Sequence, residues 1–245
     1  MTDLAKSPFP ETADIETSSD EYAGRFAGPA GEWMLKVQED ITLDLLKPTG
    51  AKSILDVGGG HGQLAHPLCR EGYNVTVLGS ALSCEKRIRD LVLAKRCEFV
   101  VGNVIALPFP DRSFDVVISF RMVTHCAQWP VLIKELCRVA KDAVIIDYPT
   151  SQSVNAIAPF FFEAKKKVEV DTRTWALFRH AQIRDELARN GYRIDTRRGQ
   201  FFFPMVVHRM LKSRGLSAAM ESVTRAIGLN NLCGSPVIVK MTRDV

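Results

Sequence analysis

The sequence lacks a long hydrophobic run. No stretch of about 18 or more uncharged apolar residues occurs among its 245 residues, so the usual membrane-spanning helix is excluded. The N-terminal part contains Asp3, Glu11, Asp14 and Glu16, where a secretory leader would need a basic start and an apolar stretch. We therefore expect a cytoplasmic protein.

Paired cysteine motifs are missing as well. The six cysteines are scattered, with no Cys-x-x-Cys pair and no His-x-x-x-His partner that would complete a zinc site. We expect free, mostly buried thiols in a reducing compartment and no metal site.

The chain as a whole has a small net charge of +4, but its two parts differ in charge. Residues 1–150 contain 16 Lys and Arg against 20 Asp and Glu, whereas residues 151–245 contain 16 against 8. A basic C-terminal part can attract an anionic substrate, a nucleic acid or an acidic lipid surface, and it can equally be an ordinary solvated surface. Peripheral membrane contact therefore stays open, and the sequence does not indicate an oligomeric state.

The organisation along the chain predicts one domain. Residues 1–20 are polar and read as a flexible tail, and residues 21–245 form the domain. A helix is expected over residues 31–46, followed by short Val/Ile/Leu-rich strands that alternate with helices. The expected strands are 53–57, 74–78, 98–101, 114–119, 143–148, 192–196 and 236–241, and the main later helices are 83–95, 130–140 and 181–189.

Such alternation is typical of an α/β fold with a mostly parallel sheet covered on both faces. The alternation ends after Tyr148, and segments at about 150–180 and 201–234 are expected to form a helical substrate cover. Ligands of these sheets bind at the carboxyl ends of the strands.

A glycine-rich turn follows the first strand, in Ile54-Leu55-Asp56-Val57-Gly58-Gly59-Gly60-His61-Gly62. Glycine lets the backbone turn sharply and approach a ligand closely. Residues 60–65 also fit the Gly-x-Gly-x-x-Ala pattern of dinucleotide-binding enzymes. With Ser80 and Arg87 as readers of a 2′-phosphate, an NADP-dependent oxidoreductase remains an alternative.

Two downstream segments decide between these interpretations. Residues 101–119, with Leu-Pro-Phe-Pro-Asp-Arg-Ser-Phe-Asp at their centre, resemble the third and fourth motifs of class I S-adenosylmethionine-dependent methyltransferases. Residues 134–139 match the Glu-x-x-Arg-Val helix of the branch that modifies small molecules such as quinones, sterols and polyketides. The resemblance covers about residues 22–150. It implies a Rossmann-like three-layer sandwich with a seven-stranded sheet, an antiparallel last strand and S-adenosylmethionine as cofactor.

The resemblance also implies where that cofactor binds. Asp56 would lie near its amino group, and Gly58, Gly60 and Gly62 would let the chain pass beneath its methionine part. We expect that Gly60→Val abolishes binding and leaves the fold largely intact, because the larger side chain would occupy the ligand's space and disfavour a positive φ.

The remaining cofactor contacts follow later strands. Asn103 would accept the adenine amino group through its amide oxygen, Val104 would flank the adenine ring, and Phe120 would lie beside the methionine moiety.

The chain departs from the family at the end of the second strand. Gly79 stands where the family usually has an Asp or Glu that accepts both ribose hydroxyls, and Ser80 would supply one weaker hydrogen bond. This predicts that Gly79→Asp tightens cofactor binding.

Residues for the chemistry are less sharply indicated. His125 follows the fourth strand and Tyr148 ends the fifth, so both are candidates for a general base or a substrate contact, and each has an ordinary structural interpretation. Asp147 and Arg25 are further candidates for ligand contacts, with the same ambiguity.

The aromatic triplets Phe160–Phe162 and Phe201–Phe203 would suit a lipophilic small-molecule substrate, or they are plain core. A nucleic-acid substrate is disfavoured, because no Asn-Pro-Pro-Tyr-like motif occurs. Because Gly79 and the uncertain base weaken the catalytic interpretation, a non-catalytic or regulatory protein with a methyltransferase fold is the second hypothesis.

Overall fold

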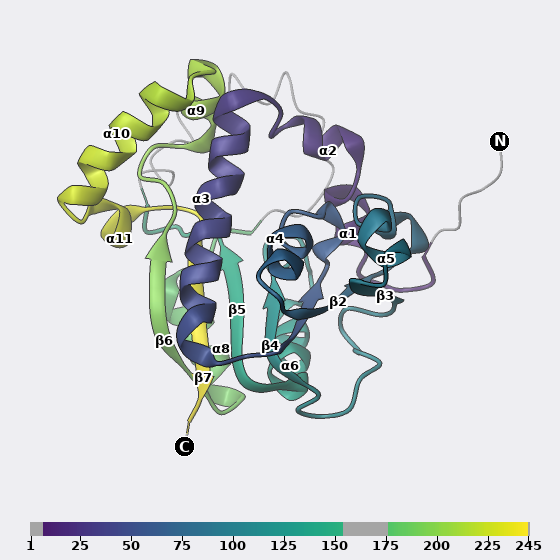
Figure 1. Ribbon diagram of the computed structural model, residues 1–245. Helices are drawn as coiled ribbons and strands as arrows, with labels where there is room; N and C mark the ends of the chain where they lie inside the picture. The colour runs from purple at the N-terminus through teal and green to yellow at the C-terminus, as the bar shows by residue number, and fades with distance from the viewer. Residues whose placement is uncertain (1–6, 154–175, 245) are drawn as a thin grey trace.

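The computed structural model describes residues 7–153 and 176–244. Within them the chain forms a seven-stranded sheet with the order β3-β2-β1-β4-β5-β7-β6, in which β7 is antiparallel to both neighbours and the other pairs are parallel (Figure 1). The strands are β1 (Ser53–Val57), β2 (Asn74–Gly79), β3 (Cys97–Val101), β4 (Phe114–Ser119), β5 (Ala140–Tyr148), β6 (Tyr192–Gly199) and β7 (Val237–Arg243). The predicted fold class is confirmed.

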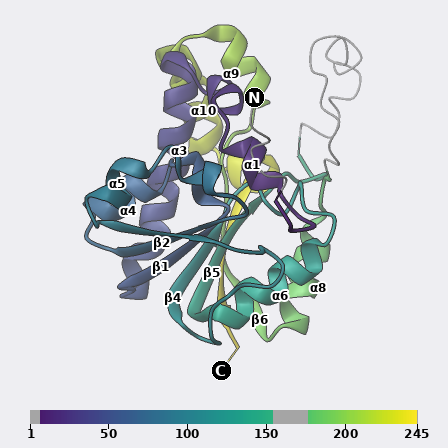
Figure 2. The same ribbon diagram turned by 90° about the vertical axis from the view of Figure 1, so that its right-hand side faces the viewer.

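Helices cover both faces of this sheet. The α-helices of the described residues are α1 (Ala13–Thr17), α2 (Asp20–Gly24), α3 (Gly28–Leu46), α4 (Ala65–Arg70), α5 (Arg89–Leu93), α6 (Trp129–Val139), α8 (His180–Arg189), α9 (Met205–Leu211), α10 (Arg214–Ala226) and α11 (Leu229–Cys233). Three short 3-10 helices are η1 (Lys47–Thr49), η2 (Gly59–His61) and η3 (Leu82–Glu85). Figure 2 shows α3, α4 and α5 on one side of the sheet and α6 and α8 on the other.

The strands alternate their apolar side chains between these two helical layers. In β1, Ile54 belongs to the core beneath α3 and α4, whereas Leu55 belongs to the core beneath α6 and α8. Ile118 and Val117 divide between the two cores in the same way in β4. Because successive side chains of a strand point to opposite faces, a central strand needs apolar residues at every position.

The strands match their sequence-based predictions to within three residues at either end. The helix expected over residues 83–95 differs, because the structure divides it into η3 and α5. Arg89 begins the second piece only after an irregular Ile88, whose φ of −120° and ψ of 8° are not helical.

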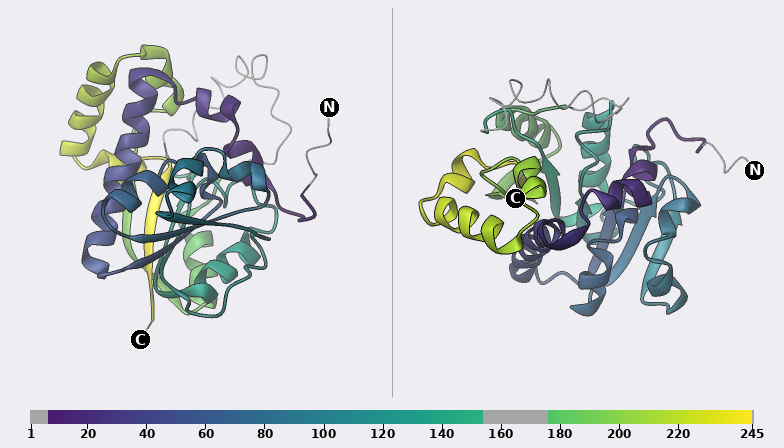
Figure 3. Two further views of the ribbon diagram at one scale, coloured as in Figure 1. Left: turned by 45° about the vertical axis from the view of Figure 1, so that its right-hand side comes forward. Right: turned by 90° about the horizontal axis from the view of Figure 1, so that it is seen from above.

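The N-terminal region differs from the expected flexible tail. Residues 13–17 form α1, and Asp14 is fully buried. Viewed from above, α1 and α2 lie across the sheet on the side of β1 and β2 (Figure 3). This segment, whose polarity predicts a flexible tail, therefore covers the carboxyl ends of two strands instead.

The C-terminal cover lies beyond the top of β6 and beside α3 (Figures 1 and 3). Its centre is the buried Glu221 of α10, which accepts hydrogen bonds from His208 Nε2 at 3.0 Å, from the Phe202 and Phe203 amides at 3.0 Å each, and from Asn230 Nδ2 at 2.6 Å. One carboxylate thus joins α9, α10 and α11 to the segment that follows β6.

Candidate cofactor site

The turn after β1 has the backbone that its glycines allow. Gly58 and Gly62 have φ values of +76° and +78°, a region that residues with a Cβ rarely adopt. The Gly58 amide donates to the Leu78 carbonyl at 2.8 Å, which ties the turn to β2. The turn is thereby fixed at the carboxyl edge of the sheet, as the sequence predicts.

Gly60 serves a different purpose from the one expected. Its φ is not positive, and a Cβ built on it would overlap Ser18 Oγ and lie 2.6 Å from the Cys84 carbonyl oxygen. The expectation that Gly60→Val spares the fold is therefore wrong, because the added side chain would first displace the protein's own Ser18 and Cys84.

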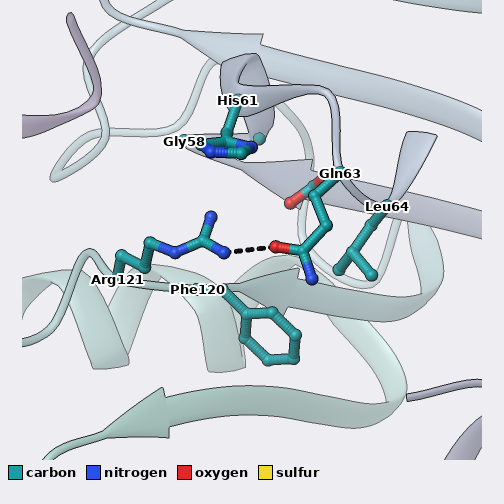
Figure 4. Close-up of a pocket in the computed structure, with 8 residues that line it drawn as sticks. Gly58, His61, Gln63, Leu64, Phe120 and Arg121 are labelled. Atoms are coloured by element: carbon teal, nitrogen blue, oxygen red, sulfur yellow. Dashed lines mark hydrogen bonds between the residues drawn. The ribbon is translucent and has the colours of Figure 1, made fainter. Parts of the chain in front are cut away.

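Asp56 lines a small pocket at this edge of the sheet. The other lining residues are Gly58, Gly59, His61, Gln63, Leu64, Phe120 and Arg121 (Figure 4). Asp56 is 3% exposed, and within residues 7–153 and 176–244 no hydrogen bond to its carboxylate is found. Burial raises the pKa of this carboxyl to about 7, against the opposing pull of the Arg121 guanidinium. A buried carboxylate without donors favours a ligand that brings a cation or hydrogen-bond donors.

Arg121 brings a positive charge to the same pocket. Its guanidinium donates to Gln63 Oε1 and, at 2.9 Å, to Gln38 Oε1, and it lies 5.2 Å from the centre of the Phe26 ring (Figure 4 shows the Gln63 bond). Its backbone has a φ of +64°, and its amide donates to Asp147 Oδ1 at 2.6 Å. Asp147 thus anchors the Arg121 turn, and the amide side chains of Gln38 and Gln63 orient the guanidinium.

Aromatic side chains from the N-terminal segment close the glycine turn. The His61 ring makes edge contacts with Tyr22 and Phe26 at centroid distances of 5.9 and 5.7 Å. Burial, with help from the charges of Arg121 and Arg87, lowers the pKa of His61 to about 3, so its ring is neutral at physiological pH. Arg25 lies 5.0 Å from the Tyr22 ring centre, where it supports this cover.

The end of β2 receives a carboxylate from elsewhere. The Ser80 amide and hydroxyl donate to the carboxylate of Asp14 at 2.5 and 2.6 Å. A Cβ at Gly79 would lie 2.7 Å from Cys84 Cβ and 3.0 Å from the Phe99 ring. This packing contradicts the expectation that Gly79→Asp tightens cofactor binding, because the new side chain has no free space.

The predicted adenine contacts follow β3. Asn103 Oδ1 accepts the Ile105 amide at 3.1 Å, so this oxygen stabilises its own turn. Val104 is fully buried in the core on the α6 side. Their roles toward adenine remain predictions, whereas Phe120 lies in the pocket beside Arg121.

The two catalytic candidates lie outside this pocket lining. His125 is half-buried in the turn after β4, where its amide donates to the Met122 carbonyl. Tyr148 is fully buried, its hydroxyl bonds to His180 Nδ1 at 2.8 Å, and burial raises its pKa. These contacts favour the structural interpretation of Tyr148, and His125 remains a candidate.

Phe201 lies in the contact between α3 and α9. Its ring packs against Trp33 at 5.4 Å and against His208 at 5.6 Å, away from the pocket. Phe202 and Phe203 pack on each other at 5.2 Å. Phe160–Phe162 lie outside the described residues. Phe201 is thus core, and the lipophilic-substrate argument loses this residue.

Sequence reasoning missed Asp14, Gln38, Gln63 and Arg121 as site residues. Arg121 directly follows Phe120, a predicted cofactor contact, just after the end of β4. This position was the signal in the sequence that could have indicated Arg121. The other three are polar residues on helices or turns without any motif, and only the fold brings them to the glycine turn.

Comparisons with known proteins agree with this geometry. Residues 55–146 match the family model described as "Methyltransferase domain". The chain is 39% identical over 109 residues to the 2-methyl-6-phytyl-1,4-hydroquinone methyltransferase of Synechocystis, covering 42% of this chain and 33% of the relative. It is 24% identical over 225 residues to the malonyl-[acyl-carrier protein] O-methyltransferase of Serratia marcescens, covering 89% and 86%.

The fold is similar to that of the magnesium protoporphyrin IX methyltransferase from Synechocystis solved with S-adenosylhomocysteine. The TM-score is 0.64 at 15% identity, covering 94% of this chain and 98% of that one. The chain spans less than half the length of the first curated relatives that it matches, 33%, 45% and 37%. Residues 55–146, with the glycine turn and its buried acid, are thus similar to a methyltransferase domain, and the fold of the chain is similar to that of a solved methyltransferase with bound S-adenosylhomocysteine.

Proposed function

We propose that this protein transfers the methyl group of S-adenosylmethionine to a small-molecule acceptor. The observation that carries the proposal is the buried Asp56 carboxylate, which faces the pocket of the glycine turn without a donor from the described residues. The amino group of the cofactor's methionine part supplies the cation that such a carboxylate needs.

The other pocket residues fit the same ligand. Gly58 lines the pocket without a Cβ, and the Arg121 guanidinium can pair with the methionine carboxylate after exchanging its amide partners Gln38 and Gln63. Phe120 offers an apolar wall. The cofactor itself supplies an activated methyl group, so the protein mainly has to orient donor and acceptor.

The relatives suggest the class of acceptor. The curated relatives include methyltransferases named for a phytyl hydroquinone, for ubiquinone and menaquinone biosynthesis, and for a methylenesterol. We propose a lipophilic ring compound for this chain, with His125 as the candidate base and residues 150–180 and 201–234 as the substrate cover of the domain. A hydroxyl acceptor would need the base, whereas an activated ring carbon would not.

One observation favours the second hypothesis, a protein that keeps the fold without catalysis. Asp14 bonds to Ser80 and Ser18 lies against Gly60, so residues of α1 and its C-cap fill the nucleoside end of the site. A chain that never releases this segment would bind no cofactor.

Calorimetry separates these functions. We expect titration with S-adenosylmethionine and with S-adenosylhomocysteine to give saturable heat, and titration with NADPH to give none. Transfer of a labelled methyl group to a panel of hydroquinones and catechols then tests catalysis. Binding of NADPH alone would favour the oxidoreductase, and binding of none of the three would favour the non-catalytic protein.

The cover also offers a surface for lipid. Leu216 and Val223 of α10 and Ile227, the C-cap of this helix, recur at helical spacing and are 49%, 64% and 66% exposed. The basic residues of segment 205–233 are Arg209, Lys212, Arg214 and Arg225, and its single acid, Glu221, is fully buried. An exposed apolar row with basic neighbours fits an anionic membrane surface, so we propose peripheral contact there. No described helix could itself cross a bilayer.

Sedimentation with vesicles tests this contact. We expect binding to vesicles that contain phosphatidylglycerol, weaker binding to phosphatidylcholine alone, and loss of binding in the Val223→Asp/Ile227→Asp variant. Leu93→Asp is the matched control, because Leu93 is 76% exposed on α5, outside the cover. Equal binding of all three proteins, or none by the wild type, would contradict the proposal. The scattered free cysteines support a cytoplasmic location, from which such a surface would reach the membrane.

A further inference from the structure

The carboxyl end of β2 has a carboxylate although its own sequence provides none. Asp14 lies 66 residues from Ser80 in the chain, and its carboxylate accepts the Ser80 amide at 2.5 Å and the Ser80 hydroxyl at 2.6 Å. The Cys84 thiol donates to the same carboxylate at 3.3 Å. Cys84 is also the residue whose Cβ fills the space beside Gly79. The acid from α1 therefore lies beside the space where a side chain at position 79 would begin.

This carboxylate has an unusual environment. Asp14 is 0% exposed, and no ion pair to it is found among the residues that the structure describes. Burying a carboxylate without a cation is costly, and a serine or asparagine could satisfy Ser80 at lower cost. An ionised carboxylate offers about four acceptor positions, of which three are used here. A further donor can therefore be accepted.

The rest of the N-terminal segment is fastened to the same edge of the sheet. Asp20 pairs with Lys86 at 2.5 Å and with Arg87 at 2.7 Å, and the Ser18 carbonyl accepts from Arg87 Nε at 3.2 Å. The Ser7 hydroxyl donates to the Ser80 carbonyl at 2.8 Å. These contacts from both sides of α1 hold Asp14 at the end of β2.

We propose that Asp14 is the ribose-binding carboxylate of this protein and replaces the acid that β2 lacks. This inference rests on the proposed function, since it needs a nucleoside ligand. The two neighbouring hydroxyls of a ribose are donors that match one carboxylate, and they would take over the positions now used by the Ser80 hydroxyl and the Cys84 thiol. Because Asp14 is fully buried, α1 moves outward by the thickness of the ligand and closes over it, so that the helix is part of the cofactor site.

The test compares two ligands on three proteins by calorimetry. The ligands are S-adenosylhomocysteine and its 2′-deoxy analogue, and the proteins are wild type, Asp14→Asn and Glu21→Gln. Glu21→Gln is the matched control, because it removes an exposed carboxylate from the same segment and leaves Asp14 and its fastening contacts in place. Melting curves without ligand verify that each variant is folded.

We expect wild type and Glu21→Gln to bind S-adenosylhomocysteine at least 10-fold more tightly than the 2′-deoxy analogue. Asp14→Asn should bind S-adenosylhomocysteine at least 10-fold more weakly and lose most of this discrimination. Unchanged or tighter binding by Asp14→Asn would overturn the inference and make α1 a plug of the site, while the proposed function would stand. If the wild type binds neither ligand, the proposed function itself fails and the inference with it. The ligand comparison on the wild type remains informative even if Asp14→Asn does not fold, because equal affinities would also overturn the inference.

Discussion

At the scale of single residues, the site combines two groups that would be costly in a purely structural core. Asp56 is a buried carboxylate without donors from the described residues, and Arg121 has a left-handed backbone and a partly buried guanidinium. Such local costs are typical of binding sites, where the ligand supplies the missing partner. The pocket is therefore expected to gain stability from its ligand and to be less stable without it.

Asp56→Asn tests this balance. Loss of the charge-assisted bond to the ligand's amino group should weaken S-adenosylhomocysteine binding by about 10- to 100-fold. The free energy of unfolding without ligand, measured in urea at pH 8, should rise by about 1 kcal/mol, because the variant no longer buries an unpaired charge. Asp142→Asn, at an exposed carboxylate of β5, should change neither quantity. If Asp56→Asn lowers the free energy of unfolding and leaves the affinity for S-adenosylhomocysteine unchanged, Asp56 has a structural role and does not bind the cofactor.

The pH dependence of binding follows from the same residue. The pKa of Asp56 is raised to about 7, so the protonated form predominates below that value and stabilises the fold, and this contribution is lost as the pH rises through 7. The cationic amino group of the ligand binds to the ionised form of the Asp56 carboxyl. Between pH 5 and 7 the ligand's amino group stays protonated, so affinity should rise by up to about tenfold per pH unit.

His61 does not interfere in this range, because its pKa is about 3. Calorimetry at pH 5, 6 and 7 measures the slope, and Asp56→Asn should abolish it. A slope that persists in this variant would assign the titration to another group, with the buried Asp147 as the first candidate, since burial raises its pKa as well.

At the scale of secondary structure, the sequence predicts the strands well because each central strand is buried on both faces. Ser53–Val57 and Phe114–Ser119 match the prediction at both ends, since a continuous apolar run between polar turns has few other interpretations. The five-residue α1 has no periodicity to detect, and its burial depends on contacts with Ser80 and Cys84 that are distant in the chain. Local patterns cannot show such contacts.

The site residues also divide into some that the sequence predicts and some that depend on contacts distant in the chain. Asp56 and the glycines after it form a continuous motif, so their position was predictable. Asp14 and Arg121 are single residues whose roles depend on where α1 and the turn after β4 pack. The failed expectation at Gly79 has the same origin, because the sequence shows a missing acid but not the Cys84 and Phe99 side chains that fill its space.

The cover provides a prediction at this scale. Glu221 connects α9, α10 and α11, and although burial raises its pKa, the donors from His208, Phe202 and Phe203 outweigh burial and lower it. Glu221→Gln leaves several of these donors poorly paired and should cost about 3 kcal/mol of stability. Amide hydrogen exchange should increase over residues 205–233 first, with the sheet protected. Stability from this carboxylate is present above its ordinary pKa of 4.5 and is lost as the pH falls through its lower value in the folded protein. Equal amide hydrogen exchange over residues 205–233 in Glu221→Gln and in the wild type would contradict the role of Glu221 in the cover.

At the scale of the whole molecule, each part of the chain has one task. The sheet brings the turns after β1, β2 and β4 to one edge, α1 and α2 close that edge, and the helices after β6 form a cover with an apolar and basic outer face. We expect this edge of the sheet to bind S-adenosylmethionine through Asp56.

A crystal structure grown with S-adenosylhomocysteine tests whether Asp56 binds the cofactor. We expect density across the carboxyl ends of β1 and β2, with the amino group within hydrogen-bonding distance of Asp56, directly or through one water, and with the methionine carboxylate near Arg121. Density elsewhere, or a pocket with Arg121 still on Gln38 and Gln63 at saturating ligand, would contradict it.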